Sequence, residues 1–320
     1  MTKPSIVYMG TPDFAVAPLN ALVENNFDVK AVVTVADKPS GRGQQMRMSA
    51  VKQYASEHNI RVIQPLKLKS PEFLEELKNL NADLFIVIAF RMLPKEVWQM
   101  PKLGTFNIHG SLLPNYRGAA PINWAIMNGD KKTGVTAFFI NEEIDSGKMI
   151  DSIEVAIEDS DDAGALHDKL MNAASNLVVQ TARNIGDGKL KLKQQVLTGK
   201  ENPAPKIFKN DCEINWSQPI EKNYNFIRGL SPYPVAWSSL YQDGKKIGQL
   251  RIYKTSIVST ESNKEHGKVV FRNGTIQLIL STGILQIDEL QWPGKKKMDV
   301  KSFLNGFRTQ ENLSVIGHLS

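Results

Sequence analysis

Residues 6–34 read IVYMGTPDFAVAPLNALVENNFDVKAVVT. The short apolar runs Ile6–Met9 and Val29–Thr34 are each typical of a buried strand, and the stretch Phe14–Glu24 between them is typical of a helix. A strand, a helix and a second strand in this order are the repeating unit of a parallel sheet, because parallel neighbours need a crossover connection. This stretch therefore favours an α/β fold.

The same alternation continues along the first half of the chain. Helix-like and strand-like segments follow one another in the order Ala50–Glu57, Val62–Ile63, Pro71–Leu80 and Leu84–Ala89. Ser70 followed by Pro71 is typical of an N-cap with proline in the first turn, so we expect a helix to begin there. The pattern predicts an α/β domain whose parallel sheet carries helices on both faces.

The remaining segments divide the chain into two predicted domains. A short helix near Ala120–Met127, strands at Val135–Asn141 and Met149–Ala156, and a long helix over 161–185 complete the first, with bounds 1–189. Residues 190–205 mix alternating lysines with Thr-Gly and Pro-Ala-Pro, a composition that suits an extended linker.

The pattern changes after the linker to short strands separated by turns. These strands are expected at Ala236–Tyr241, Gly248–Ser256, Gly267–Phe271, Thr275–Ser281 and Gly283–Gln291. The pairs Asp243-Gly244 and Asn273-Gly274 predict hairpin turns, and Asn223–Leu230 could be a helix. Residues 206–320 are therefore predicted to form a small β-barrel of the oligonucleotide-binding type.

Charge is distributed unevenly between these two parts. Residues 1–204 carry 23 Lys and Arg against 23 Asp and Glu, whereas residues 205–320 carry 16 against 10, which is the whole net charge of +6. This asymmetry suits a module that faces a polyanion, although a solvated basic surface can look the same. Trp216, Trp237 and Trp292 in the same part could stack on bases, but we favour core positions in a small barrel.

The composition also indicates the compartment. The longest uninterrupted apolar run, Leu84–Phe90, is far shorter than the ~20 residues that span a bilayer. The N-terminus shows no secretory signal, and the single Cys212 cannot form an intrachain disulfide. We expect a cytoplasmic protein without membrane contact, in which Cys212 is a structural thiol.

Several kinds of chemistry have no sequence support. The turn Gly10-Thr11-Pro12-Asp13 follows the first strand but lacks the second and third glycines of a dinucleotide fingerprint. The sequence contains no phosphate-binding loop motif and no His, Cys or carboxylate spacing typical of a metal site. Ordinary side chains are therefore expected to do the chemistry, and no metal is predicted.

The densest candidate is the segment Asn107-Ile108-His109-Gly110-Ser111. Residues two apart on a strand point to the same side, so Asn107 and His109 can face one cleft at the carboxyl end of a strand. An amide and an imidazole can stabilise the oxyanion of an acyl transfer, and Asp145, in a loop between two strands, could orient the histidine. Taken alone, this motif fits a structural histidine better, and the acidic loop fits a solvated turn.

Longer motifs add a family resemblance. The run from Gly104 to Thr136, with Gly-Ser-Leu-Leu-Pro-x-Tyr-Arg-Gly-Ala-Ala-Pro, resembles the methionyl-tRNA formyltransferases, as do Met9–Phe14 and the stretch Gly229–Trp237. The resemblance implies a Rossmann-like formyltransferase domain and 10-formyltetrahydrofolate as co-substrate. It matches Asn107, His109 and Asp145 to the catalytic trio, and Ser111, Leu112, Leu113 and Pro114 to the folate-site segment.

The resemblance also implies how the substrate, methionyl-initiator tRNA, is bound. The basic loop Asp37–Arg47 is similar to the loop that enters the acceptor stem, with Arg42 as its recognition arginine, and Lys206 matches a tRNA-binding position. Without the family, this loop would be an ordinary surface loop. The chain departs from the family pattern at Phe90-Arg91, where an aromatic residue followed by glycine is common, so Arg91 puts the shape of the folate pocket in doubt.

Two other functions compete with this interpretation. A related formyltransferase could act on glycinamide ribonucleotide or on a nucleotide-linked amino sugar, although the basic C-terminal part and the Arg42 loop count against it. The chain could instead be a non-catalytic RNA-binding protein, which the intact trio disfavours. We expect a monomeric enzyme in which the amine proton passes to Asp145, to His109 or directly to water.

Overall fold

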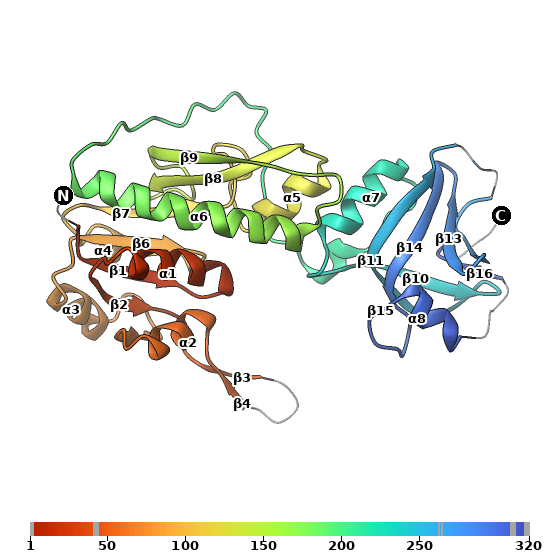
Figure 1. Cartoon of the computed structure of the whole chain (residues 1–320), viewed down its shortest axis with the longest axis horizontal. Helices are drawn as coiled ribbons and strands as arrows, with labels where there is room; N and C mark the ends of the chain where they lie inside the picture. The colour runs from red at the N-terminus through yellow and green to blue at the C-terminus, as the bar shows by residue number, and fades with distance from the viewer. Residues whose placement is uncertain (1–2, 41–44, 262, 264, 308–311, 317–320) are drawn as a thin grey trace. The chain divides into compact units, whose positions relative to one another are not determined.

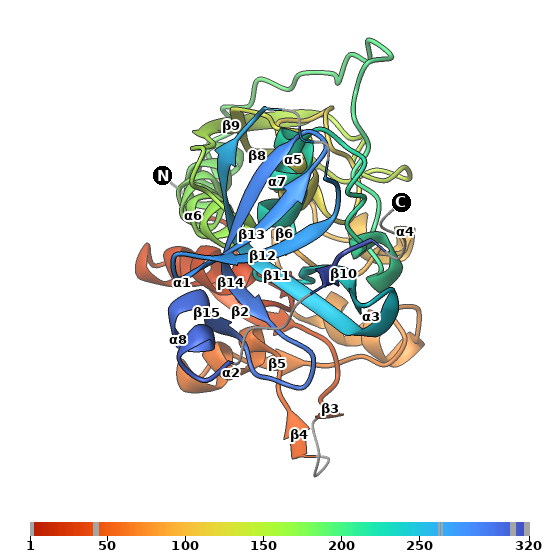
Figure 2. The same cartoon turned by 90° about the vertical axis from the view of Figure 1, so that its right-hand side faces the viewer.

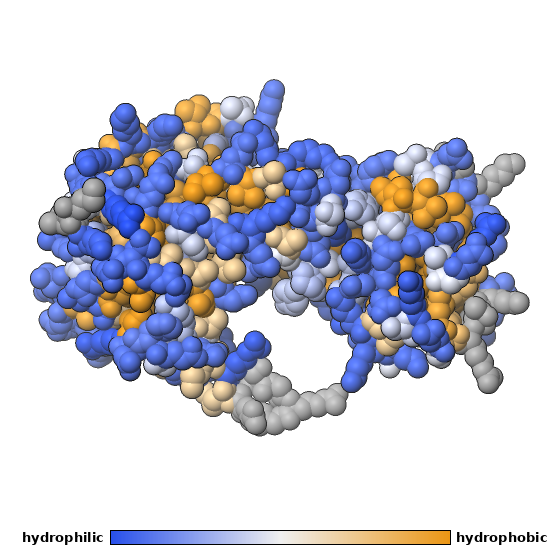
Figure 3. Space-filling model, viewed as in Figure 1, coloured by the Kyte–Doolittle hydropathy of each residue, from blue (hydrophilic) through white to orange (hydrophobic). Residues whose placement is uncertain are grey.

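A computed structural model describes residues 3–40, 45–261, 263, 265–307 and 312–316. The chain forms two compact units. Unit 1 comprises residues 1–118, 132–156 and 167–204, and unit 2 comprises 119–131, 157–166 and 205–320. Hydrophilic residues cover most of the face visible in Figure 3, and hydrophobic residues form separate patches on it. Among the helices that the structure describes, none combines the length and apolarity of a bilayer span.

Unit 1 is built on a seven-stranded sheet in the order β5-β2-β1-β6-β7-β8-β9. Its strands are β1 (Ile6–Gly10), β2 (Val29–Val33), β5 (Val62–Ile63), β6 (Leu84–Ile88), β7 (Thr105–His109), β8 (Lys132–Phe139) and β9 (Met149–Ala156). The first five strands of this order are parallel, as the alternation predicted, whereas β8 is antiparallel to both of its neighbours, β7 and β9. β1 and β6 are buried along their whole length, which explains their uninterrupted apolar sequences.

Helices cover both faces of this sheet, as predicted. They are α1 (Val16–Glu24), α2 (Ala50–Glu57), α3 (Pro71–Asn79), α4 (Lys95–Trp98) and α6 (Ala163–Gly186), with the 3-10 turn η1 (Asp13–Ala15) before α1. Val7 and Phe85 pack in one cluster with Phe73 of α3 and Val97 of α4, while α1 and α6 lie across the opposite face (Figure 1). Ser70 caps α3 by accepting a hydrogen bond from the Phe73 amide at 3.3 Å, which confirms the predicted helix start. A separate two-stranded ribbon, β3 (Lys38–Ser40) with β4 (Gln45–Arg47), follows β2.

Asp83 fixes the start of β6 to the start of β1. Its carboxylate pairs with Lys102 at 2.7 Å and accepts hydrogen bonds from the Ser5 amide at 2.9 Å and the Ser5 hydroxyl at 2.8 Å. These interactions, the Lys102 hydrogen bond first, lower the pKa of the Asp83 carboxyl from 3.8 to about 2. The charged form is therefore bound more strongly in the folded chain than in the unfolded one.

We expect Asp83→Asn to lower the free energy of unfolding by about 1–2 kcal/mol at neutral pH, because it removes charge-assisted hydrogen bonds. The folded pKa lies below the unfolded one, so this stabilisation is complete above pH 3.8 and disappears as the pH falls toward 2. Urea unfolding of both proteins between pH 7 and pH 3 measures the difference. Asp28→Asn, which breaks an exposed pair with Lys30, is the control and should change little. A difference that does not depend on pH would contradict the electrostatic explanation.

Unit 2 contains an antiparallel barrel. Its strands are β10 (Ala236–Gln242), β11 (Lys245–Ser259), β12 (Lys268–Arg272), β13 (Thr275–Leu280), β14 (Gly283–Gln291), β15 (Met298–Asp299) and β16 (Leu313–Ser314). The strand order is β11-β10-β16-β12-β13-β14-β15, and an additional pairing of β11 with β14 closes the sheet on itself (Figure 2). The small barrel predicted for the C-terminal part is confirmed.

The turns and tryptophans of the barrel follow the sequence predictions. Asp243 and Gly244 have φ values of 50° and 73°, and Asn273 and Gly274 have the same values, as two-residue hairpin turns require. Trp216 and Trp292 are buried in the barrel core, and Trp237 is partly buried against it. Burial raises the pKa of the Cys212 thiol, as befits a structural cysteine.

Helices from both halves of the sequence meet in unit 2. α5 (Pro121–Met127) packs against α7 (Ile220–Gly229), and unit 2 also contains α8 (Val300–Asn305) and the 3-10 turn η2 (Lys209–Cys212). The Asn123 side-chain amide donates to the Gly229 carbonyl at 2.7 Å, and the Trp124 indole donates to the Pro205 carbonyl at 2.9 Å. A Cβ atom on Gly229 would approach Met127 Cγ to 2.6 Å, so this helix contact needs a glycine. The contiguous domain bounds 1–189, 190–205 and 206–320 stay a prediction.

The segment that we call the connector, residues 189–204, is extended but not free. Lys193 exchanges two backbone hydrogen bonds with Met149, at 2.8 and 2.9 Å. Farther along, the Asn202 carbonyl accepts from the Tyr116 amide at 2.7 Å, and the Ala204 amide donates to the Arg117 carbonyl at 2.9 Å. Hydrogen bonds thus fix the connector to the rest of unit 1 near both of its ends.

Candidate active site

Asn107 and His109 lie at the carboxyl end of β7, as predicted. β7 is parallel to β6 and antiparallel to β8, so its end belongs to the edge where open α/β sheets bind ligands. His109 is buried, and Asn107 is partly buried. Within the described part of the chain, Asn107 Oδ1 is buried and has no hydrogen-bond partner. A buried amide with unmet capacity is unusual and is a feature of sites that take a polar ligand or water.

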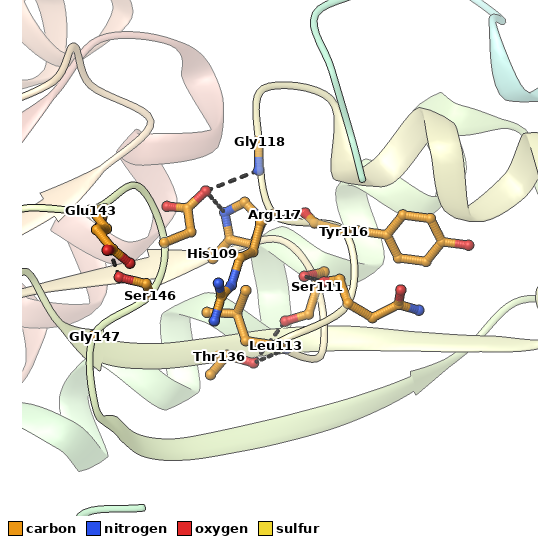
Figure 4. A network of polar contacts seen from close by, with 12 residues as sticks. His109, Ser111, Leu113, Tyr116, Arg117, Gly118, Thr136, Glu143, Ser146 and Gly147 are labelled. Atoms are coloured by element: carbon orange, nitrogen blue, oxygen red, sulfur yellow. Dashed lines mark hydrogen bonds and ion pairs between the residues drawn. The ribbon is translucent and has the colours of Figure 1, made fainter. Parts of the chain in front are cut away.

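The structure brings His109 and Asp145 together. Figure 4 shows His109 beside Tyr116 and Gly118, whose backbone groups complete this network of polar contacts. His109 Nε2 lies 2.7 Å from the Tyr116 carbonyl oxygen, and Nδ1 lies 3.7 Å from Asp145 Oδ2. A carbonyl can only accept, so Nε2 carries a proton and its direction is fixed. Nδ1 therefore faces the carboxylate, either without a proton in the neutral ring or as a second donor in the charged ring.

Asp145 is held by the loop that joins β8 and β9. Its Oδ2 accepts a hydrogen bond from the Gly118 amide at 3.0 Å. Its own φ is +52°, a left-handed conformation that is uncommon for a residue other than glycine. Two residues later, a Cβ atom on Gly147 would come within 1.6 Å of the Phe139 carbonyl oxygen, so only glycine lets this loop close. The carboxylate is thereby directed at the histidine from a fixed turn.

The segment Ser111–Pro114 is fixed from within. The Ser111 hydroxyl donates to the Asn115 carbonyl at 2.6 Å. Thr136 of β8 donates its hydroxyl to the Ser111 carbonyl at 2.7 Å and accepts from the Leu113 amide at 3.1 Å. A Cβ atom on Gly134 would lie 2.2 Å from the Ile153 carbonyl oxygen and 2.6 Å from a methyl carbon of Leu112, which explains why this position is a glycine. Ser111 is thus occupied in holding the loop beside His109.

Metal ligation finds no support here. Among the described residues, no three or more His, Cys, Asp or Glu side chains are grouped so that they could bind a metal ion. The polar groups at the site are instead an amide, an imidazole and a carboxylate, which suit proton transfer and stabilisation of a developing oxyanion.

Two family models match consecutive parts of the chain. The first, described as formyl transferase, matches residues 3–182, and the second, described as formyl transferase, C-terminal domain, matches residues 206–308. The methionyl-tRNA formyltransferase of Flavobacterium johnsoniae is 48% identical over 315 residues, which cover 98% of this chain and 100% of that protein. The enzyme of the same name from Parabacteroides distasonis is 51% identical over 310 residues, 95% of each chain. The chain belongs to the methionyl-tRNA formyltransferase family.

Solved structures with this fold are more distant. The sugar 3N-formyl transferase WlaRD, crystallised with dTDP and 5-N-formyl-THF, has a TM-score of 0.65 at 20% identity and covers 92% of this chain and 100% of its own. HypX from Aquifex aeolicus, crystallised with tetrahydrofolic acid, has a TM-score of 0.64 at 18% identity, covering 95% of this chain and 47% of that one. At such identities the likeness shows only that the formyltransferase fold is shared.

The two residues assigned to tRNA binding have different outcomes. Arg42 lies outside the described residues, so its role stays a prediction. Lys206 is exposed at the start of the second family match, and its ammonium group lies 5.3 Å from the centre of the Phe208 ring. The structure therefore tests neither the proposed contact of Arg42 with tRNA nor that of Lys206.

Arg91, where the chain departs from the family pattern, is occupied by neighbouring backbone. Its guanidinium donates to the Pro65 carbonyl at 2.5 Å and to the Leu66 carbonyl at 3.4 Å. It also lies 5.5 Å from the centre of the Phe90 ring. This arginine therefore braces the loop after β5 against the loop after β6.

Some residues that organise the site were missed in the sequence. Tyr116 contributes a backbone carbonyl and Gly118 a backbone amide, and neither group depends on a side chain that a pattern could reveal. Both lie inside the family motif, so the motif indicated the segment but not the contacts. Arg117 and Gln195 form a side-chain interaction across 78 positions of sequence, which no local pattern indicates.

Proposed function

We propose that this protein transfers the formyl group from 10-formyltetrahydrofolate to the free amino group of methionyl-initiator tRNA, giving N-formylmethionyl-tRNA. The observation that supports this most strongly is 48% identity to a methionyl-tRNA formyltransferase over 315 residues, with every residue of that protein covered. The similarity extends through unit 1 and through the barrel, so it includes the part expected to bind the tRNA as well as the candidate active site.

Asn107, His109 and Asp145 are proposed as the catalytic residues. Attack of the methionyl amine on the formyl carbon places negative charge on the formyl oxygen, and the bond from that carbon to the folate nitrogen then breaks. The buried Oδ1 position of Asn107, which has no partner among the described residues, supports a contact with this oxygen, because rotation about the last side-chain bond can place the amide donor there. His109 and Asp145 form the pair that accepts the amine proton and returns one to the departing folate nitrogen.

Ser111, Leu112, Leu113 and Pro114 are proposed to contact the folate. Their loop follows His109 directly and is held by Thr136, so its backbone and apolar side chains keep their positions before the folate binds. The folate supplies the activated formyl group, and the protein supplies alignment of the two substrates.

Residues 205–320, which include Lys206, are proposed to bind the tRNA together with Arg42. Residues 205–320 carry the net charge of +6, which suits phosphate contact rather than base reading. We further propose that the enzyme is a monomer and that it acts in the cytoplasm, where aminoacylated tRNA is used.

An assay with three alternative amine substrates tests the proposed function. Purified protein is given 10-formyltetrahydrofolate with methionyl-initiator tRNA, with glycinamide ribonucleotide or with a dTDP-linked amino sugar, and formylated product is measured. We expect formylated product with methionyl-initiator tRNA and none with either small substrate. Formylation of either small substrate in its place would assign the protein to another formyltransferase function, and no product with any of them would support a non-catalytic role.

A further inference from the structure

Gln195 is a buried side chain in an exposed part of the connector. Its side chain and backbone together are only 8% exposed, whereas the preceding Gln194 is exposed and the following Val196 is 73% exposed. Burial of a primary amide costs free energy unless its donors and acceptor are satisfied. The position therefore calls for a specific set of partners.

The Gln195 amide uses its full hydrogen-bonding capacity. Its Nε2 donates to the Asp145 carbonyl at 2.8 Å and to the Gly147 carbonyl at 2.9 Å. Its Oε1 accepts from Arg117 Nε at 3.1 Å and from Arg117 Nη2 at 2.6 Å. Carbonyls only accept and a guanidinium only donates, so these partners allow one orientation of the amide.

These partners belong to the two loops that set the position of the Asp145 carboxylate. One loop contains Asp145 and Gly147, and the other contains Arg117 and the Gly118 amide that donates to Asp145 Oδ2. Asp145 is thus held at its side chain by Gly118 and at its backbone by Gln195. The backbone contact matters because the left-handed φ of +52° at Asp145 is unfavourable for a residue other than glycine and persists only when neighbouring groups stabilise it.

We infer that Gln195 is a positioning residue for formyl transfer, which acts through Asp145 and makes the connector part of the active site. The inference rests on the proposed function for the role of Asp145. Without the Gln195 amide, Arg117 also loses its partner, and the two loops can separate. The carboxylate then leaves its place 3.7 Å from His109 Nδ1.

Two substitutions at Gln195 test this role. Gln195→Glu keeps the side-chain size and the Arg117 contact but removes both donors and directs an anionic oxygen at two carbonyls. Gln195→Met keeps the length and packing without any polar group. We expect kcat to fall on the order of 10–100-fold in both variants, with KM for methionyl-tRNA and the Kd for the folate nearly unchanged. Gln194→Glu makes the same chemical change at the adjacent exposed residue and should keep the parent kcat.

A double variant separates positioning from general damage. If Gln195 acts through Asp145, then Gln195→Met in the Asp145→Asn background should lower the single-turnover rate no further. Independent losses in the double variant, or parallel increases in KM and Kd, would overturn the positioning role. If the parent enzyme formylates methionyl-tRNA and the Gln195 variants are equally active, this inference alone is overturned. If the parent enzyme does not formylate methionyl-tRNA, the proposed function is overturned.

Discussion

His109→Ala is expected to lower kcat for formyl transfer by about 10²–10⁴-fold, the range that general acid–base groups contribute. Asp145→Asn should produce a loss of the same order, because it removes the negative charge 3.7 Å from His109 Nδ1 and weakens acceptance from the Gly118 amide. Both residues are proposed to act on charge that develops during the reaction, not on the bulk of the substrate. The Kd for methionyl-tRNA, measured by filter binding, should therefore stay close to that of the parent protein.

His58→Ala is a suitable control, since His58 lies after α2 and stacks on Tyr54 at 3.9 Å between ring centres, away from β7. It should retain full turnover. Near-normal kcat in His109→Ala or in Asp145→Asn would exclude that residue from the proposed mechanism. A loss of tRNA affinity equal to the loss of kcat would instead indicate a role in binding.

Neutralising a basic patch in unit 2 is expected to weaken tRNA binding by roughly tenfold at moderate salt for each phosphate that the patch no longer neutralises. The patch consists of Lys245, Lys246, Lys295 and Lys296, all of them exposed. The two segments that carry them adjoin, because a Cβ atom on Gly248 would lie 2.7 Å from Pro293. Replacing all four by glutamine should also make the slope of log affinity against log salt less negative by ~0.9 for each phosphate of a paired stem that is no longer neutralised.

The control removes the same amount of charge from unit 1. Lys30, Lys67, Lys69 and Lys78 are exposed there, and their replacement by glutamine should leave the slope almost unchanged. Salt titration of tRNA affinity compares the two sets, with kcat at saturating tRNA as a check on the active site. Equal effects of the two sets would show that net charge alone attracts the tRNA, and no effect of the unit 2 set would exclude this patch as a contact surface.

Much of the fold could be predicted because its signals are local. Buried runs such as Ile6–Met9, the N-cap at Ser70 and the turn pair Asn273-Gly274 each report their conformation through neighbouring residues. The reversed direction of β8 could not be predicted in this way, since a buried apolar strand has the same sequence appearance whether it runs parallel or antiparallel to its neighbours. The packing of α5 on α7 could not be predicted either, because the two helices lie far apart in the sequence and no local pattern indicates their contact.

The candidate site could likewise be predicted only where its signals are local. Asn107 and His109 share one strand end because of their spacing, so their proximity followed from the sequence. The approach of Asp145 to His109 was suggested by its loop between two strands and by the family resemblance, but its geometry depends on a left-handed turn and on Gly147. Gln195 could not be found at all, because a buried glutamine within a polar, lysine-rich stretch has the same sequence appearance as a solvated one.

The three-segment composition of unit 2 limits how this protein can be divided or recombined. Met127 belongs to the hydrophobic core of the barrel unit, although it lies far upstream of the connector in the sequence. A chimaera that joins residues 1–204 of this chain to the barrel of a relative would set a foreign α7 against the native α5. Successful exchange should require residues 119–131 and 157–166 to travel with the barrel, and sequence changes on α5 and α7 should be inherited together.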